Sequence, residues 1–197
     1  MESAFKNEHP HYEGLYKRSL DKRKDEVRGV MELGVAEGKS LLTWLDWFPH
    51  AQVVGVDNRP ARGVSPARCR ILQADQCDPS LAQLGNFDLI IDDAGHDPIK
   101  QRRSLELLWP CVNPGGFYVV EDVETSYWGI ASWNEDKLGG CRREGYEHAY
   151  GVIVFLKELM DGLTAAYANQ RPERFKQLSG LMAIHWHPNI VFLEKRS

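Results

Sequence analysis

The chain has 197 residues, a formal charge of −4 at pH 7 and 43% hydrophobic residues, which suits one well-buried α/β domain better than two. Its mixed charges give no basic footprint for nucleic acid, and no apolar run resembles a signal region or a membrane span. We therefore expect a cytosolic protein with neither a nucleic-acid nor a membrane partner. The four cysteines, Cys69, Cys77, Cys111 and Cys141, lie far apart, which suits reduced thiols.

The rest of the chain is organised around residues 27–40, V-R-G-V-M-E-L-G-V-A-E-G-K-S. An apolar run reaches Glu32, glycines stand at Gly34 and Gly38, and an amphipathic segment begins at Ser40. This pattern predicts a strand, a tight turn and a helix. Glycines allow a ligand to approach the backbone closely, and the start of a helix offers unpaired N–H groups. A cofactor loop or an ordinary strand-to-helix turn would both explain the segment.

Spacing argues against two familiar phosphate loops at this position. A P-loop requires a further glycine five residues before Gly38, where this chain has Leu33. A dinucleotide fingerprint requires G-x-G-x-x-G, whereas the chain has G-x-x-x-G. A nicotinamide oxidoreductase is therefore disfavoured.

Further apolar runs at residues 52–56, 69–74, 87–91 and 117–120 predict more strands, and each ends in acidic or polar residues. These are Asp57 with Asn58, Asp75 with Gln76, Asp92 with Asp93, and Glu121 with Asp122. In an open parallel sheet with crossover helices, such strand ends meet at one edge, where ligands bind. Asp57 lies about twenty residues beyond the first glycine, which is the usual place for a carboxylate that binds ribose hydroxyls.

The remaining segments predict helices, a loop and a terminal hairpin. We expect residues 1–26 to form an N-terminal helical cap in which Tyr12 and Tyr16 share a face. Helices are expected at 41–48, 98–110 and 146–169, a lid loop at 124–145, and a β-hairpin at the C-terminus. Tyr127, Trp128 and Trp133 are candidate walls of an acceptor pocket. His185 and His187 point to one face of the hairpin, and we interpret them as structural or solvated residues because no third metal ligand lies near them in sequence.

Two adjacent carboxylates at a strand end repel each other unless a cation or proton relieves them. The chain has two such pairs, Asp92–Asp93 and Glu121–Asp122, and His96 closely follows the first. Hard carboxylate oxygens suit Mg²⁺. This convergence favours a ligand site over simple turn formation.

Four segments carry a family resemblance: M-E-L-G-V-A-E-G-K-S-L, V-V-G-V-D, F-D-L-I-I-D-D-A-G-H and P-G-G-F-Y-V-V-E-D-V-E-T-S-Y-W. They resemble the class I S-adenosylmethionine (SAM) methyltransferases, in particular the metal-dependent macrolide sugar O-methyltransferases of the mycinamicin and tylosin type. The cephalosporin hydroxylase-like family shares the glycine loop and the E-D pair. The resemblance implies a single α/β domain over residues 1–197, with a Rossmann-like, mostly parallel seven-stranded sheet, helices on both faces and a C-terminal β-hairpin.

The same resemblance implies roles for individual residues. The SAM-binding residues would be Glu32, Gly34, Gly38, Ser40, Asp57, Asn58, Asp75, Gln76 and Asp92, with Glu32 at the cofactor's ammonium group, the glycines beside its methionine portion and Asp75 at its adenine. Mg²⁺ would be held by Asp93, Glu121 and Asp122. His96 would be the general base, with Asp93 as the second catalytic residue.

These features together predict a SAM-dependent, Mg²⁺-assisted O-methyltransferase acting on a hydroxyl of a small molecule, such as a sugar or a glycosylated natural product. A metal lowers the pKa of a bound hydroxyl, and a neutral imidazole can then take its proton. The alternatives are a catalytically silent SAM-binding module of the same fold and, less favoured, a cephalosporin hydroxylase-like enzyme. A homo-oligomer is compatible with the resemblance, although the long N-terminal domain of the family has no counterpart in these 197 residues.

Overall fold

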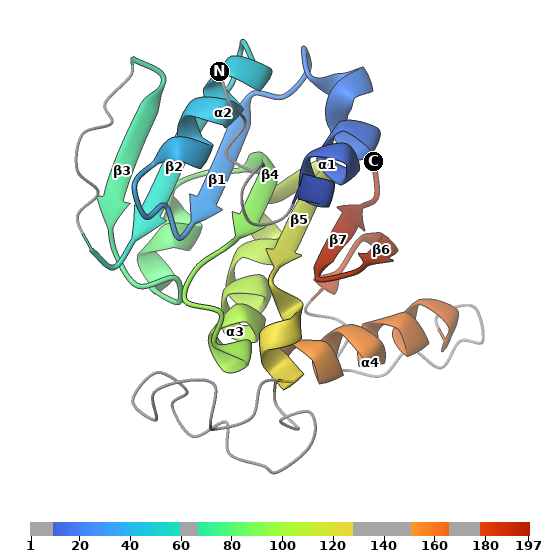
Figure 1. Cartoon of the computed structure of the whole chain (residues 1–197). Coiled ribbons are helices and arrows are strands. Elements are labelled where there is room, and N and C mark those ends of the chain that lie inside the picture. Colours follow the sequence, from blue (N-terminus) through green and yellow to red (C-terminus); the bar gives the residue numbers. More distant parts are fainter. Residues whose placement is uncertain (1–9, 60–66, 128–150, 166–177) are drawn as a thin grey trace.

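A seven-stranded sheet runs through the centre of the molecule, in the order β3-β2-β1-β4-β5-β7-β6 (Figure 1). The computed structural model describes residues 10–59, 67–127, 151–165 and 178–197. The strands are β1 (Gly29–Leu33), β2 (Gln52–Asp57), β3 (Cys69–Gln73), β4 (Phe87–Asp92), β5 (Val112–Glu121), β6 (Leu181–His187) and β7 (Ile190–Lys195). The first five strands are parallel, whereas β7 is antiparallel to both β5 and β6. The predicted sheet with its C-terminal hairpin is confirmed.

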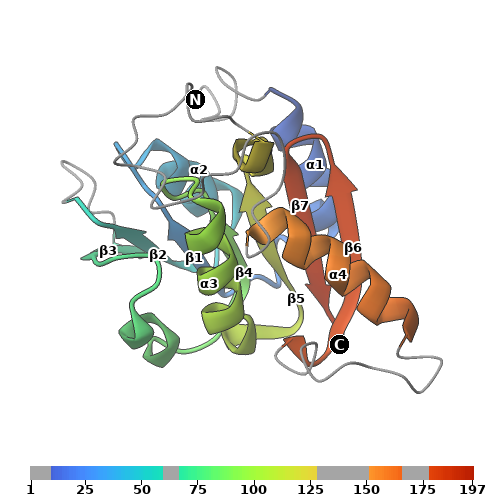
Figure 2. The same cartoon turned by 90° about the horizontal axis from the view of Figure 1, so that it is seen from below.

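Helices cover both faces of the sheet, as Figure 2 shows from below. The N-terminal helix α1 (Pro10–Leu20) and α2 (Lys39–Trp47) pack on one face, whereas α3 (Pro98–Leu108) and α4 (Val152–Ala165) pack on the other. Short 3₁₀ helices occupy Asp21–Arg23, Pro79–Gln83, Trp109–Cys111 and η5 (Val123–Tyr127). Each face has its own apolar core, because alternate residues of the buried strands point to opposite sides.

Local sequence explains where α3 begins and where α2 ends. Asp97 caps α3 by accepting hydrogen bonds from the backbone N–H groups of Ile99 and Lys100, and Pro98 fits the first turn because it needs no hydrogen-bond donor there. The second helix ends at Trp47, shortly before Pro49, because proline disfavours a helical conformation in the residue before it.

The predicted helices are present wherever the structure describes them. Of the predicted helix at residues 146–169, the structure describes residues 151–165, in which α4 begins at Val152 and extends to Ala165. The predicted lid is described only at residues 124–127, which belong to η5. The described residues include no helix that is long and apolar enough to cross a membrane. Cys69, Cys77 and Cys111 are free thiols, and Cys141 lies outside the described residues.

Candidate active site

The glycine loop between β1 and α2 lies against the connection that follows β4. Gly34 has φ of +84°, and a Cβ atom placed on it would lie 2.2 Å from the backbone oxygen of Asp93. Only glycine fits this position, because any side chain would collide with that backbone. Gly38 also has a left-handed backbone where it caps α2. The close approach at Gly34 therefore joins the predicted cofactor loop to the predicted metal-binding strand end.

Glu32 is buried beside the glycine loop and faces α2. Its carboxylate accepts a hydrogen bond from Nε1 of Trp44 over 3.0 Å, and it also bonds the side chain of Ser40. Burial raises the pKa of Glu32 to about 7, although both hydrogen bonds oppose the shift. Ser40, a predicted SAM residue, thus contacts Glu32 directly.

Asp57 ends β2 and binds the backbone of the glycine loop. Its Oδ2 accepts hydrogen bonds from the N–H groups of Val35 and Ala36, over 3.0 and 3.1 Å. Its Oδ1 accepts a hydrogen bond from the backbone N–H of Arg59. The adjacent Asn58 is exposed, and its backbone oxygen accepts a hydrogen bond from Gln73. Asp57 therefore positions the glycine loop.

Asp75, the predicted adenine partner, lies after β3 and is engaged by its own neighbours. One carboxylate oxygen accepts a hydrogen bond from the backbone N–H of Cys77. The other lies 2.6 Å from Nζ of Lys100 on α3. The Lys100 ammonium group holds the pKa of Asp75 below its usual value. Both side chains are about half exposed, so this ion pair is weak enough to exchange partners.

Gln76 and Asp92 form a buried network on the α3 side of the sheet. Asp92 is fully buried and accepts hydrogen bonds from Gln76, Ser104 and Tyr118. Burial raises its pKa to about 6, and these bonds limit the shift. Because side chains alternate along β4, Asp92 points away from the side on which Asp93 lies. The structure thus separates the two members of the predicted D-D pair.

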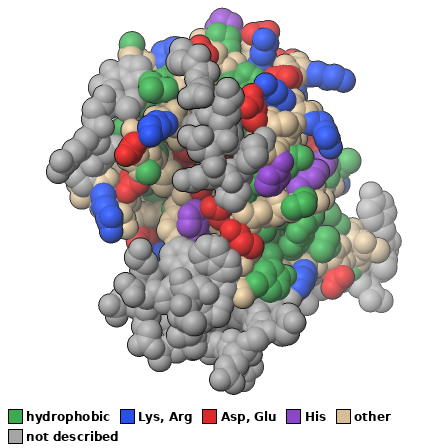
Figure 3. Space-filling model, viewed as in Figure 1, with side chains coloured by type: hydrophobic (Ala, Val, Ile, Leu, Met, Phe, Trp, Pro, Cys, Tyr) green, Lys and Arg blue, Asp and Glu red, His purple; other side chains and the backbone are tan. Residues whose placement is uncertain are grey.

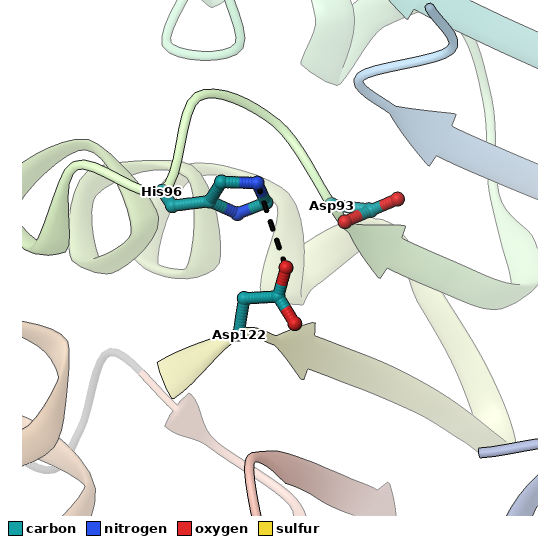
Figure 4. A group of neighbouring side chains, drawn as sticks. All are labelled: Asp93, His96 and Asp122. Atoms are coloured by element: carbon teal, nitrogen blue, oxygen red, sulfur yellow. Dashed lines mark ion pairs between the residues drawn. The ribbon is translucent and has the colours of Figure 1, made fainter. Parts of the chain in front are cut away.

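Asp93, His96 and Asp122 form the acidic centre of the site (Figure 4). Each offers one ligand atom, and these atoms all lie within 4.8 Å of one another. Nε2 of His96 is 3.5 Å from Oδ2 of Asp122. Both residues have φ of 52°, a left-handed conformation that costs energy in non-glycine residues and often marks functional sites.

The charges at this centre favour a cation. Burial and the neighbouring carboxylates of Glu121 and Glu32 raise the pKa of Asp93 well above its usual value. Burial, followed by the charges of Glu32 and Asp122, raises the pKa of Glu121 to about 8. A divalent cation would relieve this repulsion, and carboxylate oxygens are the ligands that Mg²⁺ prefers. The residues present therefore fit such an ion. Glu121 borders the three-residue cluster and is not part of it.

Among the described residues, three side chains that sequence motifs did not assign to the site donate hydrogen bonds to the carboxylates of the E-D pair. Tyr16 donates a hydrogen bond to Oε1 of Glu121, and Tyr12 donates one to Oδ1 of Asp122. Asn189, in the turn between β6 and β7, donates to the same Oδ1. Sequence showed that Tyr12 and Tyr16 share a helix face, but only the packing of α1 and the hairpin reveals what that face contacts.

A groove of about 400 Å³ lies beside this centre, between η5, the start of α4 and the hairpin. Its lining residues are Val123, Glu124, Tyr127, Ile153, Trp186, His187, Pro188 and Asn189. Figure 3 shows hydrophobic side chains gathered beside histidine side chains, with acidic side chains nearby. Tyr127 was predicted as a pocket wall, whereas Trp128 and Trp133 lie outside the described residues. His187 lines the groove, and His185 pairs with Glu194.

Comparisons with known proteins agree with these observations. A family described as "Methyltransferase domain" matches residues 31–123. The chain is 32% identical to the 8-demethyl-8-alpha-L-rhamnosyl tetracenomycin-C 2'-O-methyltransferase of Streptomyces olivaceus, over 94% of this chain and 50% of that protein. It is also 32% identical to the mycinamicin VI 2''-O-methyltransferase of Micromonospora griseorubida, over 94% of this chain and 47% of that protein. The chain thus spans about half the length of the curated relatives it matches.

A solved structure extends the likeness to three dimensions. The structure of the MycE methyltransferase from the mycinamycin biosynthetic pathway, in complex with Mg and S-adenosylhomocysteine (SAH), aligns with a TM-score of 0.81 and 29% identity. The alignment covers 96% of this chain and 50% of the other. A further MycE structure also contains mycinamycin VI. The resemblance inferred from the motifs is confirmed: residues 31–123 match the methyltransferase domain family, and the chain has the Rossmann-like methyltransferase fold.

Proposed function

We propose that the chain is a SAM-dependent, Mg²⁺-assisted O-methyltransferase that modifies a sugar hydroxyl of a glycosylated small molecule. The observation that carries the proposal is the Asp93–His96–Asp122 cluster, which adjoins a glycine loop at the carboxyl edge of the sheet. The two sugar O-methyltransferases that share about a third of its residues support the choice of substrate class.

The SAM site in this proposal follows the ends of β1, β2 and β3. Glu32 would face the cofactor's ammonium group, and Asp57 would face its ribose, each held in place by the contacts described above. Gly34 and Gly38 shape the loop. The carboxylate of Asp75 would release Lys100 and accept a hydrogen bond from the adenine amine instead. Asn58, Ser40 and Gln76 complete the set, and the buried Asp92 supports it through Gln76. When bound, SAM supplies a methyl group already activated as a sulfonium.

In this proposal, the residues of the acidic centre activate the hydroxyl group of the acceptor. Asp93, Glu121 and Asp122 would hold a Mg²⁺ ion, whose contribution when bound is to lower the pKa of a hydroxyl group. Nε2 of His96 is the atom that takes the hydroxyl proton. The carboxylate of Asp122, 3.5 Å from that nitrogen, favours the imidazolium that results. In this proposal the catalytic residues are His96, as the base, and Asp93, as a ligand of the ion.

The groove beside the centre is the proposed place for the rest of the acceptor. Glu124 and Asn189 line it and also adjoin Asp122, so the groove continues into the catalytic centre. Trp186 and Tyr127 offer aromatic faces on which the apolar side of a sugar or its aglycone can pack. A Trp186→Ala variant should therefore raise KM for the acceptor more than it lowers kcat.

The proposal is tested by titrating the purified chain with SAH in a calorimeter, followed by methyl-transfer assays against rhamnosylated polyketides with and without EDTA. We expect SAH binding, and turnover that EDTA abolishes. A chain that binds no SAH would refute the proposal. A chain that binds SAH and transfers no methyl group to any glycoside would be the catalytically silent module instead.

A further inference from the structure

Asp122 uses its two carboxylate oxygens differently. Its Oδ1 accepts hydrogen bonds from the hydroxyl of Tyr12 over 2.9 Å and from Nδ2 of Asn189 over 3.2 Å. Its Oδ2 lies in the cluster, 3.5 Å from Nε2 of His96. Two donors on one oxygen fix the rotation of the carboxylate, so the other oxygen is directed at the centre of the site.

The donors on Oδ1 are themselves tied together. The Tyr12 hydroxyl also lies 2.9 Å from the backbone oxygen of Asn189, and the side-chain oxygen of Asn189 accepts the N–H of Glu124 over 2.9 Å. This arrangement joins α1, the end of β5 and the β6–β7 turn around one carboxylate. Asn189 has φ of 66°, a left-handed conformation that asparagine adopts more readily than most residues.

Glu121 is held by the same helix. Tyr16 is fully buried, and its hydroxyl donates a hydrogen bond to Oε1 of Glu121. Adjacent residues of a strand point to opposite faces, but the left-handed backbone of Asp122 ends that alternation. Two tyrosines one turn apart on α1 therefore reach two adjacent carboxylates.

We propose that Tyr12, Tyr16 and Asn189 are positioning residues that orient Asp122 and Glu121 for a divalent cation. The inference rests on the proposed function, because it assumes that these carboxylates bind a metal. Partners that hold the ligands of a metal typically change its affinity 10- to 100-fold when they are removed. Because linkage is reciprocal, a bound cation should also stabilise the docking of α1.

The test measures the dissociation constant for Mg²⁺ by calorimetry, using the full chain saturated with SAH. The variants are Tyr12→Phe, Tyr16→Phe and Asn189→Gly, of which the last keeps a residue that tolerates positive φ. We expect each to bind Mg²⁺ about 10- to 100-fold more weakly. The matched control is Tyr118→Phe, which removes another buried hydroxyl donor, on Asp92, and should leave the dissociation constant within about twofold.

Thermal melts separate a positioning role from a purely structural one. A purely structural contact would lower Tm and leave the dissociation constant of the folded protein unchanged. Hydrogen exchange gives a second measurement: Mg²⁺ should slow exchange in α1 of the wild type and not in a Tyr12→Phe/Tyr16→Phe variant. If the wild type binds Mg²⁺ and all three variants bind it equally well, this inference is overturned and the proposed function stands. If the wild type binds SAH but no divalent cation, the metal assignment fails and the inference fails with it.

Discussion

The hydroxyl of Tyr12 lies 2.9 Å from Oδ1 of Asp122, although the two residues are 110 positions apart in the chain. This contact brings the N-terminal helix to the carboxyl edge of the sheet, where the candidate site lies. The same helix places Tyr16 on Glu121. The helix α1 therefore contacts the candidate site as well as covering the apolar core.

Gly34→Ala should disrupt the site, because its Cβ atom would lie 2.2 Å from the backbone oxygen of Asp93. We expect a destabilisation of at least about 2 kcal/mol in urea unfolding, together with loss of SAH binding. Gly180→Ala is the matched control: its φ is +80°, but its nearest neighbours lie 3.7 Å away. Equal destabilisation of the two variants would mean that backbone strain, and not the contact with Asp93, explains the glycine.

Glu32→Gln should stabilise the protein without cofactor at pH 8. Burial raises the pKa of Glu32 from 4.5 to about 7. A carboxyl with a raised pKa favours folding below its unfolded pKa, and this contribution is lost as the pH rises through the folded value. We expect a gain of about 1–3 kcal/mol at pH 8 that shrinks towards pH 5, measured by urea unfolding. Glu37→Gln, on an exposed side chain, should show no such gain. A less stable Glu32→Gln variant at pH 8 would contradict the buried environment.

His96→Asn should lower kcat by about 10²–10⁴-fold while SAH affinity stays nearly constant. Asparagine tolerates the left-handed backbone of this position, so the change removes the base with little added strain. His185→Asn, in the hairpin, is the control and should retain activity. Loss of SAH binding in His96→Asn would show that His96 supports the cofactor and is not the base.

Asp75→Ala and Lys100→Ala distinguish two roles of an exposed ion pair. If Asp75 binds the adenine, its removal should weaken SAH binding about tenfold, whereas removal of Lys100 should not weaken it. Both variants should unfold within about 1 kcal/mol of the wild type, because exposed ion pairs contribute little. If Lys100→Ala weakens SAH binding and Asp75→Ala does not, the ion pair has a local structural role and Asp75 does not bind the adenine.

Sequence predicted the sheet and its acidic edge well because both depend on local patterns. Buried strands give apolar runs, and Asp93, Glu121 and Asp122 follow such runs directly. The separate environments of Asp92 and Asp93 could have been anticipated from alternation along β4. By contrast, Asn189 could not be assigned, because its contact with Asp122 depends on the pairing of β7 with β5 and on the shape of the hairpin turn.

Gly34 shows the same limit at a residue that sequence did single out. Its missing side chain was expected to make room for the cofactor's methionine portion, a role that the structure leaves as a prediction. What the structure shows is that Gly34 makes room for the backbone of Asp93. Such a contact between segments distant in sequence carries no local signal.

The most direct test of the central claim is the transfer of an isotopically labelled methyl group from SAM to a rhamnosylated polyketide, followed by mass spectrometry with Mg²⁺ and with excess EDTA. We expect a single methyl group on a sugar oxygen with Mg²⁺, and none with EDTA. Labelling that proceeds equally well in EDTA would contradict a cation-assisted reaction at Asp93, Glu121 and Asp122.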